Sequence, residues 1–313
     1  MNTDIKIFSP KDFPGYLPKL NALYEDLFSG GKGFRSKLLH PFAQSLGIPG
    51  ETEKLLGQTI EFIHNASLLH DDLIDRSSLR RGKTTAWLKY TPEYAVLAGD
   101  YLLARVMVNL SSFGNIQLVQ YTAEVISDLL EGEWIQDSLV KDFKITLDQL
   151  DRVHNLKTAS LFKWCLRAPF ITIQRLDPNL HSVLEEMGTL LGVLFQRSDD
   201  LLDFDVRNYE GKALLGDLKS GYLNSFAVFL MNDLDSNKKS LFVKVNNLEE
   251  LKTLVGEAYF INKLNEFDQL NRKLMARYDS LLRVFDSFLQ ENEKDLVLQL
   301  DTLHELLYWR KKG

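Results

Sequence analysis

Apolar side chains recur at three- and four-residue spacing along most of this chain, and that spacing is the period of an amphipathic α-helix. Clear examples lie at 55–63 and 180–194, where leucine, isoleucine, valine and methionine return to one helical face. The sequence lacks alternating strand patterns bounded by Asn-Gly or Asp-Gly turns. We therefore predict an all-α protein, a bundle of roughly ten helices.

The breaks between the predicted helices are short. Glycine, proline, asparagine and clustered charges mark them, and none is long enough to link two domains. The sequence has no repeat at a solenoid period and no low-complexity tract. With 45% of its 313 residues hydrophobic, the chain can bury a large core. We expect a single all-helical domain over residues 1–313.

Charge and cysteine content limit the class of protein further. A net charge of −6, from 37 basic and 43 acidic side chains without a long basic block, argues against a nucleic-acid partner. The one cysteine, Cys165, excludes an internal disulfide and suits the core. No secretory signal is visible, and Asp100 and Arg105 interrupt the most apolar stretch, 94–108, so we predict no transmembrane helix. We expect a cytoplasmic protein.

Two acidic clusters of the form DDxxD stand inside apolar helical stretches. They consist of Asp71, Asp72 and Asp75, and of Asp199, Asp200 and Asp203. On a helix, positions i and i+4 share one face and i+1 lies beside them, so each cluster directs three carboxylates to one side. Such carboxylates repel one another unless a cation lies among them. Magnesium, which prefers oxygen ligands and often also binds substrate phosphate, is the cation that this pattern favours.

A single DDxxD could equally be a solvated acidic helix face, but two copies inside apolar stretches favour the metal site. Arg80 and Arg81 follow the first cluster, and guanidinium groups suit phosphate oxygens. Near the start, Lys32 and Arg35 belong to a glycine-rich turn, which could bind a second anion or be only a solvated turn. The pattern predicts a metal-bridged polyphosphate.

These residues belong to a longer ordered set of motifs. The set consists of Gly30-Gly31-Lys32 with Arg35, His64 with Ala66-Ser67-Leu68 and His70-Asp71-Asp72, Arg80-Arg81-Gly82, Gly99-Asp100-Tyr101-Leu102-Leu103-Ala104, Gly132-Glu133 with Gln136, Lys157-Thr158-Ala159-Ser160-Leu161-Phe162, Phe195-Gln196 with Asp199-Asp200-Leu201-Leu202-Asp203-Phe204, and Gly211-Lys212 with Asp217-Leu218. From Gly30 to about Gly221 the chain resembles the trans-isoprenyl diphosphate synthases, also called polyprenyl synthetases.

The resemblance implies the isoprenoid synthase fold, in which helices surround a central cavity. It also implies the condensation of an allylic diphosphate with isopentenyl diphosphate to an all-trans polyprenyl diphosphate, with three magnesium ions bound by the two aspartate clusters. Metal ions and basic side chains can neutralise the leaving diphosphate while its carbon–oxygen bond breaks to an allylic cation. No covalent nucleophile is needed.

The resemblance assigns roles to the remaining motif residues. The residues that would bind isopentenyl diphosphate are Lys32, Arg35, His64 and Arg81. Arg80 would bind the allylic diphosphate. The predicted catalytic residues, at that diphosphate or at the reacting carbons, are Lys157, Thr158, Gln196 and Lys212. Taken in isolation, His64 would suit a core position, and Asp100 after Gly99 would suit a helix cap.

Several positions depart from the family pattern. Gly33 stands where the family usually has arginine, and Ser36 where it usually has proline. Arg197 stands where an apolar residue usually precedes the second cluster, and it could point outward or pair with a carboxylate. After Asp217 the usual lysine is missing, and Lys219 could substitute for it.

Product length is expected to depend on the helix before the first cluster. Ala66 and Ser67 are small, whereas short-chain members of the family tend to carry an aromatic residue there, so we expect a geranylgeranyl or longer product. Ile60 and Ile63 could contribute to a floor below the product.

Other expectations concern assembly and alternative functions. We expect a homodimer, with a docked C-terminal helix favoured over one that touches a membrane surface; a transient membrane contact for product release stays open. Two other functions also stay open. The chain could be a non-catalytic partner subunit of a heteromeric synthase. It is less well matched to a class I terpene cyclase, whose second metal site usually has a mixed Asn/Ser/Glu pattern.

Overall fold

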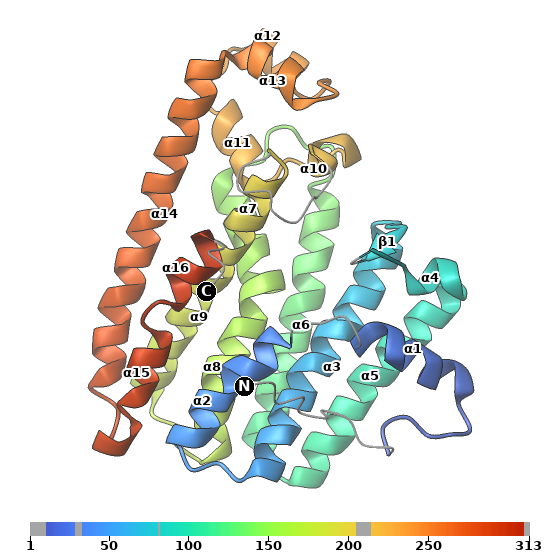
Figure 1. Ribbon diagram of the computed structural model, residues 1–313, viewed down its shortest axis with the longest axis vertical. Coiled ribbons are helices and arrows are strands. Elements are labelled where there is room, and N and C mark those ends of the chain that lie inside the picture. Colours follow the sequence, from blue (N-terminus) through green and yellow to red (C-terminus); the bar gives the residue numbers. More distant parts are fainter. Residues whose placement is uncertain (1–10, 29–32, 81, 205–213, 310–313) are drawn as a thin grey trace. The chain divides into compact units, whose positions relative to one another are not determined.

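The computed structural model describes residues 11–28, 33–80, 82–204 and 214–309, with only the backbone for 24–28. Its helices (Figure 1) are α1 (Pro18–Phe28), α2 (Phe34–Ser45), α3 (Gly50–Ile74), α4 (Ala86–Lys89), α5 (Pro92–Phe113), α6 (Ile116–Ser138), α7 (Leu147–His154), η1 (Asn155–Ala159), α8 (Ser160–Thr172), α9 (Pro178–Leu202), α10 (Gly216–Ser220), α11 (Ser225–Met231), α12 (Ser236–Phe242), α13 (Leu248–Val255), α14 (Glu257–Asp286), η2 (Glu291–Glu293), α15 (Asp295–Leu300) and α16 (Leu303–Trp309). A short antiparallel hairpin, β1 (Leu79–Arg80) and β2 (Lys83–Thr84), pairs Leu79 with Thr84. The predicted all-α class is confirmed.

The chain divides into two compact units. Unit 1 comprises Met1–Ile126 and Trp164–Asp177, and unit 2 comprises Ser127–Lys163 and Pro178–Gly313. The division falls inside α6 and α8, so each of these helices contributes residues to both units. The first aspartate cluster lies in unit 1 and the second in unit 2. The single-domain organisation and the central cavity stay predictions.

In unit 1, α3 and α5 run side by side (Figure 1). Thr91 caps α5 by accepting a hydrogen bond from the backbone N–H of Tyr94 at 3.2 Å, and Gly114 ends the helix with a φ of 86°. Ile63 of α3 and Leu102 of α5 are both buried. The turns of α3 that precede the first aspartate cluster are therefore held in a core.

The single cysteine lies on the part of α8 that belongs to unit 1. The Cys165 side chain is fully buried, and its Sγ atom lies 3.8 Å from the backbone oxygen of Arg35. Burial raises the pKa of this thiol well above its ordinary value, because an apolar environment disfavours the thiolate. Cys165 is the core residue that the sequence predicts.

In unit 2, α9 packs closely against η1 and the start of α8. A Cβ atom at Gly192 would lie only 2.2 Å from Cα of Ala159, and one at Gly188 would lie 2.6 Å from Cα of Lys163. Only glycine allows the two segments to approach this far. Leu191, on the same helix, is fully buried. The turns of α9 before the second aspartate cluster are therefore also held in a core.

The C-terminal helix α16 packs against α9 and α14 in unit 2 (Figure 1). The Tyr308 hydroxyl donates to Oδ1 of Asp268 at 2.7 Å and accepts from Nδ2 of Asn271 at 3.0 Å. The backbone oxygen of Tyr308 accepts from the Ser198 hydroxyl at 2.7 Å. The described part of the C-terminal segment is thus a docked helix, as predicted.

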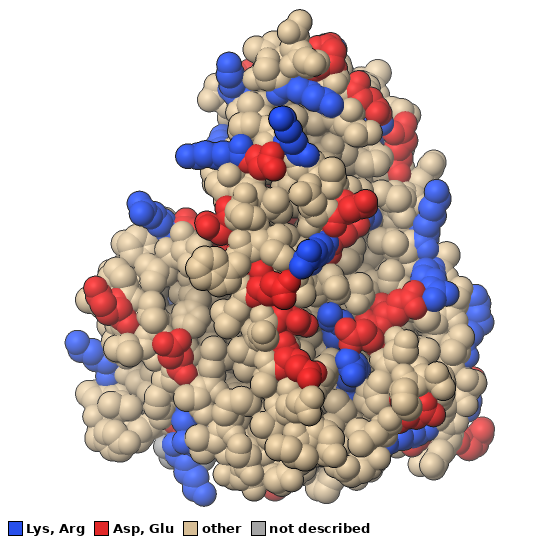
Figure 2. Space-filling model, turned by 180° about the vertical axis from the view of Figure 1, so that it is seen from behind, with Lys and Arg blue, Asp and Glu red and all other residues tan. Residues whose placement is uncertain are grey.

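The described ranges show two features of helix composition and surface charge. None of the helices there combines the length and the apolar character needed to cross a bilayer. On the face shown in Figure 2, basic side chains are scattered and alternate with acidic ones. On that face, charged ligands would therefore meet local groups of side chains and not one continuous basic surface.

Candidate functional site

The first aspartate cluster lies at the C-terminal end of α3. Asp71 and Asp72 belong to its last turn, and Asp75 is its C-cap residue. A helix C-terminus carries partial negative charge, so carboxylates at this end favour the approach of cations. One cation comes from β1: Nε and Nη2 of Arg80 donate to Oδ1 of Asp72 at 2.9 and 2.5 Å. Asp72 is buried, whereas Asp75 is exposed.

His70, immediately before this cluster, packs against α5. A Cβ atom at Gly99 would lie 2.2 Å from Nε2 of His70, so the imidazole occupies the space that a side chain would need. The same nitrogen lies 3.4 Å from Oδ1 of Asp100. Asp100 lies inside α5, and the interpretation of this residue as a helix cap was therefore wrong.

Of the residues predicted to bind isopentenyl diphosphate, only two lie in the described ranges. Arg35 in α2 and His64 in α3 are both half-buried and both belong to unit 1. Lys32 and Arg81 lie outside the described residues. Of the predicted diphosphate-binding residues, Arg80 contacts the first cluster. The contacts to isopentenyl diphosphate stay predictions.

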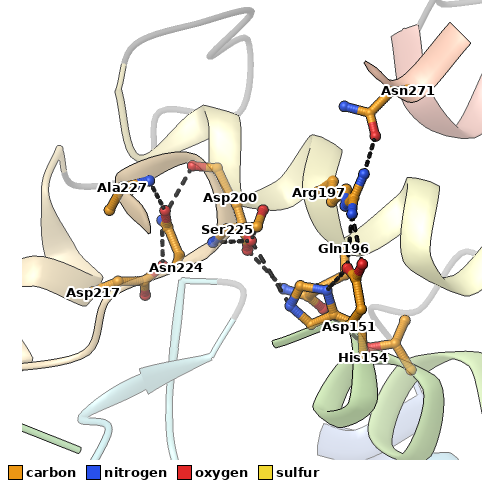
Figure 3. A network of polar contacts seen from close by, with 11 residues as sticks. Asp151, His154, Gln196, Arg197, Asp200, Asp217, Asn224, Ser225, Ala227 and Asn271 are labelled. Carbon is orange, nitrogen blue, oxygen red and sulfur yellow. Dashed lines mark hydrogen bonds and ion pairs between the residues drawn. The ribbon is translucent and has the colours of Figure 1, made fainter. Parts of the chain in front are cut away.

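The second aspartate cluster lies at the C-terminal end of α9. Asp200 is buried, and its Oδ2 atom accepts hydrogen bonds from the backbone N–H and the hydroxyl of Ser225, at 2.9 and 2.5 Å (Figure 3). Its Oδ1 atom accepts from Nε2 of Gln196 at 3.1 Å. Burial raises the pKa of Asp200 to about 6, although these donors oppose the shift; the nearby Asp199 adds to the rise.

Asp203, the last residue of this cluster, holds the chain that follows the undescribed segment 205–213. Its Oδ1 atom accepts from the backbone N–H of Gly216 at 2.7 Å, and its Oδ2 atom accepts from that of Asp217 at 3.2 Å. Asp217 in turn accepts from Nδ2 of Asn224 at 2.9 Å (Figure 3). The acidic cluster and the start of α10 are therefore one hydrogen-bonded unit.

Thr158 and Gln196, both predicted catalytic residues, are in direct contact. The Thr158 hydroxyl donates to Oε1 of Gln196 at 3.0 Å, which leaves the amide nitrogen of Gln196 directed to Asp200. Thr158 lies in η1, a single π-helical turn. Such turns are frequent at functional sites because they redirect side chains that an α-helix would place elsewhere. The turn lies where Gly192 allows the close approach of α9.

Lys157, from the same π turn, forms an ion pair with Glu133 of α6. A Cβ atom at Gly132 would lie 2.7 Å from Cγ of Lys157, so glycine is required for this side chain to lie along α6. Lys212, the remaining predicted catalytic residue, lies outside the described residues. The three described residues of the predicted catalytic set thus lie in unit 2, with Thr158 and Gln196 beside the second cluster and Lys157 against α6.

Comparison with known proteins identifies the family. The family model for polyprenyl synthetase matches residues 17–259. The chain belongs to the polyprenyl synthetase family. It is 34% identical over 199 residues to octaprenyl diphosphate synthase of Escherichia coli (strain K12), covering 63% of this chain and 61% of that protein. It is 33% identical over 260 residues to the chloroplastic solanesyl diphosphate synthase 1 of Arabidopsis thaliana, covering 80% and 64%.

Solved polyprenyl synthetase structures agree with this membership. The crystal structure of a decaprenyl diphosphate synthase from Rhodobacter capsulatus matches with a TM-score of 0.83 and 27% identity, covering 96% of this chain and 92% of that one. The matched regions of the two curated relatives above span less than two thirds of their length. Family membership and fold are therefore established.

Two departures from the polyprenyl synthetase pattern have a local explanation. Gly33 precedes α2 with a φ of 53°, in the left-handed region that favours glycine. The backbone N–H of Ser36 donates to Oε1 of Glu61 at 3.2 Å, a bond that proline could not make. Glycine and serine at these two positions therefore suit the backbone at the start of α2.

The other departures lie near the second cluster. Arg197 does not point outward: it is 3% exposed and pairs with Asp151. Lys219 is exposed, and its Nζ atom donates to the backbone oxygen of Leu214 at 3.1 Å. The pKa of Tyr222 is raised by burial and by nearby carboxylates, including that of Asp200, so this hydroxyl stays protonated beside the cluster.

The donor set of both clusters fits magnesium. Six carboxylates supply only oxygen ligands, and magnesium usually takes one or two protein carboxylates with waters and substrate phosphate. Within the described ranges, no three histidine, cysteine or acidic side chains already form a metal-binding group. Oxygen donors of this kind suit ions that complete their coordination with a phosphate-containing substrate.

Sequence reasoning missed several residues that contact the second cluster. Ser225 bonds Asp200, and Asn224 both bonds Asp217 and caps α11 by accepting from the backbone N–H of Ala227 at 3.0 Å. The Asn-Ser pair before an apolar run is a helix start signal, and that signal could have identified them. Asp151 had no comparable sequence signal.

Proposed function

We propose that this chain is a magnesium-dependent trans-polyprenyl diphosphate synthase, a prenyltransferase that condenses isopentenyl diphosphate with an allylic diphosphate. The match to the polyprenyl synthetase family carries the proposal, because the matched residues 17–259 include both aspartate clusters. Relatives named as octaprenyl, solanesyl and decaprenyl diphosphate synthases support a geranylgeranyl or longer product.

Both clusters would bind magnesium, with three ions expected. The ligands would come from Asp71, Asp72, Asp75, Asp199, Asp200 and Asp203. Bound magnesium would supply positive charge to the leaving diphosphate as its carbon–oxygen bond breaks. Arg80 donates to Asp72, and this contact supports a basic residue within reach of the diphosphate. Arg80 would exchange part of that contact for phosphate oxygens.

The residues of unit 2 would orient the reacting groups. The hydrogen bond from Thr158 fixes the amide of Gln196, which in turn donates to Asp200. Lys157, which pairs with Glu133, would bind the allylic diphosphate together with Lys212. Isopentenyl diphosphate would be bound by Lys32, Arg35, His64 and Arg81. A cytoplasmic homodimer, and a transient membrane contact for product release, complete the proposal and rest on the family resemblance.

The test is an elongation assay. Purified protein is incubated with magnesium, labelled isopentenyl diphosphate and dimethylallyl, geranyl or farnesyl diphosphate, and the products are sized after removal of phosphate. We expect magnesium-dependent, elongated prenyl products. Asp71→Ala should abolish them, while Asp295→Ala, which removes an exposed aspartate at the start of α15, should not.

The outcomes separate the alternatives. Cyclic hydrocarbon formed from a prenyl diphosphate alone would identify a terpene cyclase instead. Absence of turnover with every primer, followed by activity on mixing with a second synthase chain, would identify a non-catalytic partner subunit. Equal activity in the Asp71→Ala variant would reject the role of the first cluster.

A further inference from the structure

Arg197 is a buried cation two residues before Asp199. Its Nη2 atom donates to both carboxylate oxygens of Asp151, at 2.9 and 2.7 Å, and its Nη1 atom donates to Oδ1 of Asn271 at 2.8 Å (Figure 3). The Arg197 side chain is only 3% exposed, and its guanidinium lies 5.7 Å from the ring centre of Phe267. One side chain of α9 is therefore bonded to both α7 and α14.

The contacts continue to the C-terminal helix. Asn271, which is fully buried, donates from Nδ2 to the hydroxyl of Tyr308 at 3.0 Å. Ser198, the residue after Arg197, donates to the backbone oxygen of Tyr308 at 2.7 Å. Two consecutive residues of α9 are thus tied to α14 and α16 immediately before the second aspartate cluster.

Asp151 lies on the helix that leads into the predicted catalytic segment. Helix α7 ends at His154, and η1, which carries Lys157 and Thr158, follows without a break. The Arg197–Asp151 ion pair and the Thr158–Gln196 hydrogen bond therefore join the same two segments at two points. Between segments joined in this way, sliding or rotation is restricted.

Stability alone gives no reason for an ion pair at this position. Removing two charges from water costs free energy that their attraction often does not recover, and apolar pairs of similar volume are commonly as stable. The guanidinium differs from an apolar side chain in its directional geometry, because its planar group bonds Asp151 through Nη2 and Asn271 through Nη1 at fixed angles. The feature that the charged pair adds is a defined relative position of the two segments.

We propose that Arg197 and Asp151 form a positioning pair, which sets α9 against α7 and η1 so that Thr158, Gln196 and Asp200 are aligned for catalysis. Neither residue touches substrate in this proposal; both act through the neighbouring residues that do. The inference rests on the proposed prenyltransferase function, and it names residues that the family resemblance does not assign.

The test compares Arg197→Met, Asp151→Leu and the double variant Asp151→Leu/Arg197→Met. Asp151→Leu leaves the buried Arg197 without its carboxylate, and Arg197→Met leaves the half-buried Asp151 without its guanidinium, so both variants should melt at lower temperature, the first by more. The double variant should recover most of the melting temperature. Its kcat at saturating substrates should nevertheless stay at least about tenfold below that of the parent, with KM changed much less, because misaligned catalytic groups slow the reaction without removing binding contacts.

A second readout does not depend on turnover. Hydrogen exchange at the backbone amides of 196–203, measured by mass spectrometry on the protein without substrate, should be faster in the double variant than in the parent. If the parent shows no elongation activity, the proposed function fails while this measurement still tests the positioning pair. Parent-like kcat and parent-like exchange in the double variant would overturn the inference.

The chain offers a matched control pair. Arg277 of α14 donates from Nε and Nη2 to the two carboxylate oxygens of Glu186 of α9, at 2.6 and 2.8 Å, and so also pairs an arginine with an acidic residue across two helices. This pair is exposed and lies three turns before Arg197. Glu186→Leu/Arg277→Met should leave both kcat and the exchange of 196–203 unchanged. Arg197→Lys, which keeps the charge and loses the fork, should retain more stability than Arg197→Met and still show reduced kcat.

Discussion

At the scale of single residues, Asp200 shows how the fold treats a buried carboxylate. Ser225 donates twice to one oxygen and Gln196 donates to the other, so the charged form is hydrogen-bonded on both sides. Burial nevertheless raises its pKa to about 6. Desolvation therefore outweighs three donors, and a bound cation would reverse that balance.

The hydroxyl of Ser225 should contribute measurably to the free energy of unfolding. Ser225→Ala removes one donor and keeps the backbone N–H, so a buried acceptor loses one of its partners. We expect the free energy of unfolding to fall by about 1–3 kcal/mol in denaturant titrations at neutral pH. Ser240→Ala, which removes an exposed hydroxyl bonded to the Asn237 backbone oxygen, is the control and should change it by less than about 0.5 kcal/mol. Equal effects of the two changes would contradict the prediction.

His154 predicts a specific pH dependence of stability. Burial lowers the pKa of His154 from 6.5 to about 4, so the folded protein keeps it neutral where the unfolded chain binds a proton. The neutral histidine therefore contributes fully to the free energy of unfolding above pH 6.5. Up to about 3 kcal/mol of that contribution is lost as pH falls toward 4. Asp200, whose pKa is raised, has the opposite effect. Its contribution to the free energy of unfolding is lost as pH rises through about 6.

Comparison of the parent with His154→Leu isolates the histidine. The free energy of unfolding, measured in chelator at several pH values between 4 and 7, should decline less steeply with falling pH in the variant. Parallel curves for the two proteins would show that His154 is not kept neutral by the fold.

At the level of helices, the close contact between α9 and η1 requires a glycine at position 192. Gly192→Ala would place Cβ 2.2 Å from backbone Cα of Ala159, so the two segments must separate. We expect a loss of about 1–3 kcal/mol in unfolding free energy and a lower kcat, because Thr158 and Gln196 lie on the separated segments. Denaturant titration and the elongation assay measure the two effects.

Gly50 provides the matching control. It lies at the start of α3, and a Cβ atom there would meet nothing within 4 Å. Gly50→Ala should leave kcat unchanged and keep or slightly raise stability, because alanine restricts the unfolded chain. If Gly192→Ala and Gly50→Ala change kcat and unfolding free energy equally, the close packing at Gly192 does not determine the positions of Thr158 and Gln196.

Helices with strong periodicity were predictable, and the short ones were not. The stretches 55–63 and 180–194 lie within α3 and α9 as predicted. Helices α10 to α13 are at most eight residues long. A helical hydrophobic repeat is recognised over a longer window, so these helices give no clear pattern. Asp100 was misjudged because glycine before aspartate marks a helix start locally, whereas this glycine makes room for the His70 ring.

At the scale of the whole molecule, the aspartates could be predicted and their surroundings could not. Both clusters are local patterns, readable from spacing within one helix. The partners of Asp200 and Arg197 are distant in sequence: Ser225 follows Asp200 by 25 residues, and Asn271 follows Arg197 by 74. Only the tertiary fold brings such residues together, so no periodicity in the sequence identifies them.

Ligand binding should stabilise the whole chain in a metal-dependent way. If both clusters bind magnesium through a diphosphate, magnesium with inorganic diphosphate at about 100 times the dissociation constant should add roughly 2.7 kcal/mol. For a chain of this size that corresponds to a melting temperature higher by about 5 °C. Magnesium with sulfate serves as the control. An equal rise when chelator replaces magnesium would contradict the metal-bridged mode.

Because Cys165 is buried, the rate at which its thiol is labelled reports how often the structure around it opens. Cys165 is the one thiol in 313 residues, and it lies wholly inside unit 1. A thiol-specific reagent can modify it only after that unit opens, so the rate of labelling reports how often opening occurs. Labelling with and without ligand would thus measure, without any engineered dye site, how far a ligand's stabilisation extends to unit 1.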